Sequence, residues 1–129
     1  MPAPRLARLT APFLLAACAA TTVADAPPPA AAGVASGKPV NCLTQRLTDN
    51  QRVIDTRTIL YRVGRQWYRN DLPNECPRLD DRATIITRTT ISQICAGDIF
   101  EVADLTTHTS YGSCVFGKYT PVTLPKTTR

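Results

Sequence analysis

The sequence contains few of the residues that build metal and redox sites. Among its 129 residues there is one histidine, and the five cysteines form no C-x-x-C pair. Structural zinc sites usually pair their ligands two to four residues apart, so we expect no metal ion. The missing C-x-x-C also argues against a dithiol redox enzyme. The short chain excludes a multidomain enzyme, and we expect no cofactor.

Motifs for nucleophilic catalysis are also missing. His108 with Ser110 or Ser113 is the only possible Ser/His pairing in its segment, and no G-x-S-x-G is present. Residues 106–113 are instead expected to form a loop. Loops on rigid β scaffolds often bind partners, so His108 and Tyr111 are the candidate binding residues.

Acidic residues offer one further route to catalysis. Asp80 or Asp81 could act with Asp98 or Glu101, provided that two carboxyl groups face each other across a cleft. The simpler role for Asp80, Asp81 and Asp98 is in turns or caps. We therefore expect no enzymatic activity.

The sequence has no apolar run long enough to span a bilayer. The longest early run, from Leu9 to Ala17, is apolar except for Thr10 and follows Arg5 and Arg8. As a helix it would be about 14 Å long, whereas the bilayer core is about 30 Å thick. A short apolar run behind basic residues is typical of a secretory signal peptide.

The apolar run ends in the sequence Leu-Ala-Ala-Cys at Cys18. This ending resembles the lipobox of bacterial lipoproteins, which implies a signal over 1–18, lipid attachment at Cys18 and anchoring to a membrane. Ala19 after the cysteine resembles sorting to the outer membrane. The alternative is cleavage after Ala26, at an A-x-A site, which would release a soluble periplasmic protein.

Composition then divides the rest of the chain. Residues 19–40 contain eight alanines and four prolines and show no apolar periodicity. We interpret them as a disordered tether, because proline-rich segments favour an extended, solvated backbone. Residues 41–124 hold most of the larger apolar side chains and form the expected compact domain. Residues 125–129 are a C-terminal tail.

Four cysteines remain in the domain: Cys42, Cys76, Cys95 and Cys114. An even number in an exported protein predicts two disulfides. Three connectivities are possible. We favour Cys76–Cys95 and Cys42–Cys114, because this nested arrangement would close a central loop and join the two ends of the domain.

Short β-strands are predicted throughout the domain. Residues 57–63 alternate apolar and polar side chains, and Gly64-Arg65 suits a tight turn before a second strand at 66–72. Further strands are expected around 53–54 and at 84–91, 99–103 and 114–122, with one helical turn at 90–95.

The predicted fold is mainly all-β. Five or six short antiparallel strands, joined by turns every 8–15 residues, favour a small disulfide-bonded barrel or sandwich. Alternate apolar residues of these strands should form the core. The expected core residues are Ile54, Ile59, Tyr61, Trp67, Leu72, Ile85, Ile94, Phe100, Val102, Val115 and Tyr119.

Arginines are frequent in the domain and lie among Tyr61, Trp67 and Tyr68. They are Arg46, Arg52, Arg57, Arg62, Arg65, Arg69, Arg78, Arg82 and Arg88. Such a pattern occurs in proteins that bind single-stranded nucleic acid. Export argues against that partner, and residues 41–124 have ten basic against nine acidic residues. A solvated sheet face with locally paired arginines is the simplest interpretation, and contact with anionic lipid or cell-wall polymer is the alternative.

Several motifs of the domain occur together: TILYR at 58–62, YRNDLP at 68–73, CPRL at 76–79, ICAGDI at 94–99 and GSCVFGKYTP at 112–121. Over residues 41–123 the chain resembles a family of small exported proteobacterial proteins of unknown function. The resemblance implies the same domain and the same cysteine framework. It implies no activity and no catalytic residue.

The leading functional hypothesis is a non-catalytic lipoprotein domain of the cell envelope. It would act by binding or as a structural accessory, with an envelope protein or a cell-wall polymer as partner and the membrane reached through the N-terminal lipid. One alternative is an inhibitor-like protein that inserts the 106–113 loop into an envelope hydrolase. The other is a small carboxylate-dependent hydrolase.

Overall fold

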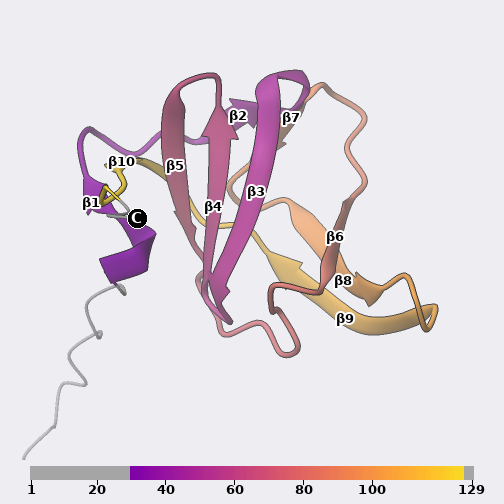
Figure 1. The fold of residues 1–129 in the computed structure, drawn as a ribbon. Coiled ribbons are helices and arrows are strands. Elements are labelled where there is room, and N and C mark those ends of the chain that lie inside the picture. The colour runs from indigo at the N-terminus through magenta and orange to yellow at the C-terminus, as the bar shows by residue number, and fades with distance from the viewer. Residues whose placement is uncertain (1–29, 127–129) are drawn as a thin grey trace, which may run out of the picture.

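The computed structural model describes residues 30–126, and they are mostly β-structure. Figure 1 labels the strands in chain order. The elements are η1 (Ala30–Ala32), β1 (Val34–Ala35), β2 (Cys42–Thr44), η2 (Gln45–Leu47), β3 (Thr48–Asp55), β4 (Thr58–Val63), β5 (Gln66–Asp71), β6 (Thr84–Thr87), β7 (Gln93–Cys95), β8 (Ile99–Asp104), β9 (Thr109–Val115) and β10 (Tyr119–Thr123).

The mainly β, antiparallel fold is confirmed. Every strand pairing is antiparallel, and no α-helix occurs in residues 30–126. Of the two expected forms, a barrel or a sandwich, the closed barrel is not formed, because the largest sheet ends at β1 and β3 and these two strands do not pair. The helical turn expected at 90–95 is also wrong. Its second half is strand β7, and the two 3-10 turns lie at η1 and η2.

The largest sheet has five strands in the order β1-β10-β5-β4-β3. Strands β4 and β5 form the predicted hairpin, and Gly64 takes a φ of 59° in its turn. That left-handed conformation favours glycine, which explains why the turn occurs at this position.

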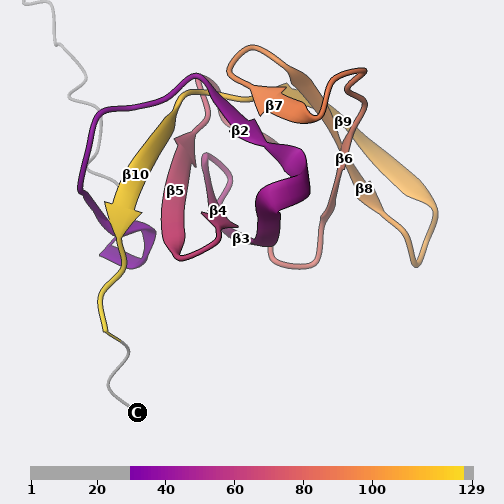
Figure 2. The ribbon, with the colours of Figure 1, turned by 90° about the horizontal axis from the view of Figure 1, so that it is seen from above.

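Two smaller sheets complete the fold, one of strands β6-β8-β9 and one of strands β2-β7. In Figures 1 and 2 the β8–β9 hairpin extends away from the five-stranded sheet. The hairpin therefore carries part of the chain outward from the body of the domain.

The core receives side chains from all three sheets. Phe116 stacks on Phe100 with ring centroids 4.3 Å apart, and Tyr61 packs edge-on against Phe116. The expected core residues that are buried are Ile59, Tyr61, Leu72, Ile94, Phe100, Val102 and Tyr119. The predicted burial of Val115 is wrong, because that side chain is exposed. Ile54, Trp67 and Ile85 are only partly buried, whereas Leu43, Leu79 and Phe116 were missed.

All four domain cysteines form disulfides, but the predicted pairing is wrong. The bonds are Cys42–Cys95 and Cys76–Cys114, not Cys76–Cys95 and Cys42–Cys114. Strands β2 and β7 pair antiparallel and place Cys42 directly opposite Cys95. Cys76 lies after β5 and is buried in the core beside Cys114 of β9. The connectivity follows from sheet pairing, which cysteine spacing does not encode.

The ordered domain begins before residue 41. In the described part of the predicted tether, β1 pairs with β10, and Val40 forms a bridge with Tyr119. Ala32 is completely buried, so the prediction of a disordered segment is wrong for residues 30–40. The rest of that segment, the signal sequence, Cys18 and the cleavage site after Ala26 lie outside the described residues.

Candidate binding site

A groove with a volume of about 560 Å³ lies on the three-stranded sheet, between strand β8 and the chain that follows β6. Its volume falls within the range of small-molecule sites. The lining residues are Ile86, Arg88, Thr89, Thr90, Ile91, Gly97, Asp98, Ile99, Phe100, Glu101 and Ser113.

Strand alternation explains why the groove is partly apolar. Phe100 and Val102 face the core, so Ile99 and Glu101 point to the opposite face of the sheet. Ile99 is 64% exposed, and Ile91 on the facing segment is 58% exposed. Large aliphatic side chains exposed beside one another are a feature of binding surfaces.

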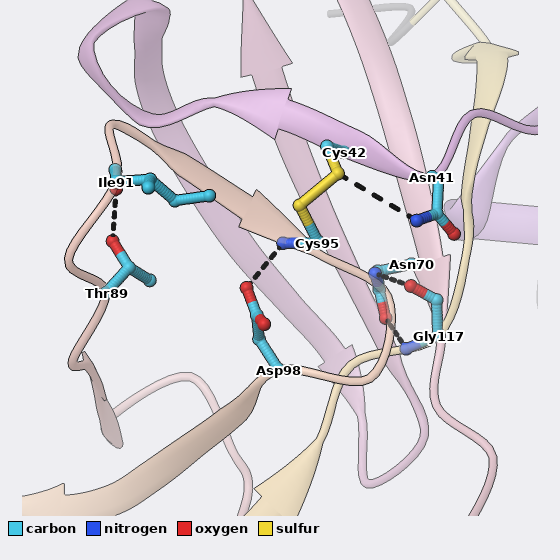
Figure 3. Close-up of a disulfide and its surroundings, with 8 residues drawn as sticks. All are labelled: Asn41, Cys42, Asn70, Thr89, Ile91, Cys95, Asp98 and Gly117. Carbon is cyan, nitrogen blue, oxygen red and sulfur yellow. Dashed lines mark hydrogen bonds between the residues drawn. A yellow bond between two sulfur atoms is a disulfide. The ribbon is translucent and has the colours of Figure 1, made fainter.

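Hydrogen bonds hold one wall of the groove in place. The Thr89 hydroxyl donates to the carbonyl oxygen of Ile91 at 2.6 Å, as Figure 3 shows. The Gln45 side-chain amide of η2 donates to the hydroxyl of Thr87 at 3.2 Å. These contacts order the segment after β6 without a ligand, which lowers the entropic cost of binding.

The other wall is fixed next to a disulfide. The Asp98 carboxylate accepts a hydrogen bond from the backbone N–H of Cys95 at 2.8 Å, and Cys95 is bonded to Cys42 (Figure 3). The backbone N–H of Phe116 donates to the Asp98 carbonyl oxygen at 3.0 Å. Asp98 therefore has the turn role that the sequence predicted, and it also lines the groove.

Glu101 supplies the second acidic group of the groove. Its carboxylate accepts a hydrogen bond from the Ser110 hydroxyl at 2.5 Å and lies 3.9 Å from the Arg88 guanidinium. Arg88 is 85% exposed, so this ion pair is weak and leaves Glu101 able to attract another cation. The groove thus combines aliphatic walls with two carboxylates and one exposed arginine.

The tip of the β8–β9 hairpin is a second exposed feature. The Asp104 carboxylate accepts hydrogen bonds from the backbone N–H groups of Thr106 and Thr107, at 2.7 and 3.1 Å. These bonds, that of Thr107 foremost, hold the pKa of Asp104 below its usual value. His108 has a φ of 53°, and Leu105 is 61% exposed. The tip is therefore a shaped turn with an outward aliphatic side chain.

Of the two predicted binding residues, only His108 lies in this turn. Tyr111 belongs to strand β9, is partly buried against the core, and has the Arg78 guanidinium 4.8 Å above its ring. A hydrogen bond to Tyr111 raises the pKa of Arg78. The expectation that residues 106–113 form a loop is wrong for residues 109–113, because strand β9 begins at Thr109 and contains Tyr111.

The structure separates the candidate acids. The Asp80 carboxylate accepts hydrogen bonds from the backbone N–H groups of Arg82 and Ala83, which is the expected turn role. Asp98 and Glu101 share the groove, and neither Asp80 nor Asp81 lines it. Ser113 lines the groove without His108. Sequence reasoning missed the aliphatic walls, although residues 84–91 are rich in threonine and isoleucine and include Ile86 and Ile91 of the groove.

Comparison with protein-family models, curated proteins and solved structures finds no match to this chain. No helix in residues 30–126 is long and apolar enough to cross a bilayer. The same residues contain no cluster of histidine, cysteine and acidic side chains that could hold a metal ion. The two disulfides indicate an oxidising, exported environment.

Proposed function

We propose that this chain is a non-catalytic binding module of the bacterial cell envelope, anchored by a lipid on Cys18. The disulfides support export, and the Leu-Ala-Ala-Cys sequence supports lipid attachment. The groove on the three-stranded sheet is the binding site. The observation that carries this proposal is the exposure of Ile91 and Ile99 across a groove whose walls are already held by hydrogen bonds.

The occupant is an extended segment of another envelope protein, with an apolar side chain next to a lysine or arginine. The apolar side chain would fill the space between Ile91 and Ile99. The neighbouring cation would meet Glu101 and Asp98, which outnumber the single arginine of the groove. This charge pattern favours a basic peptide over an acidic one.

Binding suits the two carboxylates better than hydrolysis. The Asp98 carboxylate already accepts a hydrogen bond from the backbone N–H of Cys95, and the Glu101 carboxylate accepts one from the Ser110 hydroxyl, so both are held as ionised acceptors that can still attract a cation. General acid–base catalysis needs a carboxyl group that is free to exchange a proton with a substrate. We therefore assign both groups to recognition.

Photo-crosslinking in living cells tests the groove. A benzoylphenylalanine placed at Ile91 or at Ile99 should give the same discrete product. Val34, an equally aliphatic and more exposed position on β1, is the matched control. Sequencing of the crosslinked peptide should find an apolar residue beside a lysine or arginine. Products of equal yield from all three positions, or an acidic crosslinked segment, would refute the proposal.

Metabolic labelling tests the anchor separately. Labelled fatty acid should enter the wild-type chain and fail to enter the Cys18→Ala variant. Equal labelling of both proteins would exclude lipid attachment at this cysteine and favour cleavage after Ala26. The groove proposal does not depend on this result.

The inhibitor-like function is a second candidate, because the hairpin extends outward and Asp104 shapes its tip. In that case Leu105 and His108 would enter a partner, and Leu105→Ser would abolish the interaction while Ile99→Thr would not. The groove proposal predicts the reverse. Pull-down of the crosslinked partner with both variants distinguishes the two functions.

A further inference from the structure

The five-stranded sheet carries a cluster of two arginines and one tryptophan on the face opposite the core. Tyr61 and Tyr68 are directly opposite each other in β4 and β5 and pack in or against the core. Arg62 and Trp67, paired one residue further on, therefore point to the other face. This cluster belongs to neither the groove nor the hairpin tip.

Both guanidinium groups contact the same indole ring. The Cζ atom of Arg62 lies 5.8 Å from the ring centroid of Trp67, and that of Arg52, reaching from β3, lies 5.2 Å from it. Each distance is within the range of cation–π attraction, which holds a guanidinium flat against an aromatic face. The ring thereby gathers two positive charges at one place on an outer sheet surface.

Among the side chains that the structure describes, Arg52 and Arg62 differ from the neighbouring Arg69 in having no acidic partner. Arg69, on the same face, has an ion pair with Asp71 at 2.9 Å and donates to the carbonyl oxygen of Gly33. Among the residues that the structure describes, neither Arg52 nor Arg62 has an ion pair. The Nε of Arg62 is buried and has no hydrogen-bond partner within the same residues. The positive charges of Arg52 and Arg62 lie on one ring, and the Nε of Arg62 is a buried donor without an acceptor among these residues. An anion bound here would neutralise the charges and accept hydrogen bonds from these arginines.

We propose that Arg52 and Arg62, held against Trp67, bind a phosphate-bearing group. Arginine recognises phosphate through several parallel N–H donors, and two arginines match the multiple charges of a phosphate chain or an array of headgroups. The source is either a soluble phosphate compound or the phosphate of a lipid headgroup. The site is independent of the groove and of the proposed function.

Trp67 is the only tryptophan of the chain, so its fluorescence reports on this site alone. We would titrate the purified domain with inorganic tripolyphosphate, with phosphatidylglycerol vesicles and with phosphatidylcholine vesicles. Isothermal titration calorimetry provides a second readout that does not depend on the indole. Sodium chloride of equal ionic strength controls for screening.

The proposal predicts saturable binding of tripolyphosphate, of phosphatidylglycerol vesicles, or of both, and the responding probe identifies the source. Arg52→Gln and Arg62→Gln should each weaken the affinity about tenfold. Arg82→Gln removes the same charge from an exposed position elsewhere and should leave the affinity unchanged. No binding of either phosphate probe, or equal weakening by Arg82→Gln, would overturn the proposal.

Discussion

The five-stranded sheet and the three-stranded sheet are both antiparallel, but they differ in which faces they bury and which they expose. One face of the five-stranded sheet contributes Tyr61 and Tyr119 to the core, where they pack with Phe116. Its outer face is partly covered by the N-terminal segment around Ala32. The three-stranded sheet contributes Phe100 and Val102 to the core but leaves Ile99 and Val115 exposed on its other face. Burial on the first sheet stabilises the fold, and exposure on the second provides a surface for a partner.

Two connections between the sheets fix the base of the β8–β9 hairpin. Asn70 of β5 is completely buried, and its side chain exchanges two hydrogen bonds with the backbone of Gly117, at 2.8 and 2.9 Å. The Cys76–Cys114 disulfide joins the loop after β5 to strand β9. The projecting hairpin is thus fastened at its base and free at its tip, as a binding element on a rigid scaffold requires.

The largest predicted effect concerns that disulfide. Removing Cys76 and Cys114 together by alanine should lower the free energy of unfolding by about 4 kcal/mol, because the bond closes a loop with a sequence separation of 38. Amide exchange should rise more in β8 and β9 than in β4 and β5. Cys42→Ala with Cys95→Ala is the control of similar loop length, and it should spare β8 and β9. If both variants show the same amide-exchange profile, the Cys76–Cys114 disulfide does not stabilise β8 and β9 in particular, which would contradict this prediction.

Gly117→Ala should destabilise the domain by about 3 kcal/mol, since a Cβ at this position would overlap the carbonyl oxygen of Asp71. The measurement is urea denaturation. Gly64→Ala is the control: a Cβ there meets no neighbour, and only the left-handed backbone costs about 1 kcal/mol. Equal losses for the two glycines would show that the close approach at Gly117 contributes nothing.

Asn70→Ala leaves the N–H and the carbonyl of the half-buried Gly117 without their partner. We expect a loss of about 2 kcal/mol in urea denaturation. Asn50→Ala, at an exposed position of β3, should change the unfolding free energy by less than about 0.5 kcal/mol. An unchanged unfolding free energy for Asn70→Ala would mean that water replaces both hydrogen bonds. The Asn70–Gly117 contact would then not fix the base of the hairpin.

The smallest predicted effect is confined to the hairpin tip. The lowered pKa of Asp104 means that its capping bonds are fully present above the ordinary carboxyl pKa and are lost as pH falls through the lowered value. The amide shifts of Thr106 and Thr107 should titrate at lower pH than in an unstructured peptide of the same sequence. Asp104→Asn should abolish this titration and leave the unfolding midpoint unchanged. If the amide shifts of Thr106 and Thr107 titrate with the same pH midpoint in the protein and in the peptide, the turn is not preformed.

Local patterns predicted much of the fold. The alternation around Ile59 and Tyr61 and the glycine at the β4–β5 turn specify a hairpin from neighbouring residues alone. The disulfide pairing failed because it depends on β2 meeting β7, a contact between segments with no sequence signal linking them. Val115 was misplaced because the single strand expected at 114–122 is in fact two strands. Val115 ends β9 and Tyr119 begins β10, so the two side chains do not share one strand face.

The candidate site was predictable only in pieces. Arg88 was considered as a surface arginine, Asp98 and Glu101 as candidate acids, and Ser113 as a nucleophile. The structure brings all four to one groove. The aliphatic walls depend on which neighbours cover them, and that is a property of the tertiary structure. The N-terminal segment at 30–40 was missed for a related reason, because alanines of low apolar area become buried only when a sheet face is available.

One measurement tests most directly whether the exposed face of the three-stranded sheet serves binding and not stability. In cells, the crosslinking yield from benzoylphenylalanine at Ile91 is compared between the wild-type background and Ile99→Thr, with urea denaturation of both proteins. Threonine keeps a β-branched side chain at an exposed strand position and removes apolar surface from the groove. We predict a yield lowered about tenfold and an unfolding free energy changed by less than about 0.5 kcal/mol. An unchanged yield, or a loss of more than about 2 kcal/mol in stability, would contradict the account.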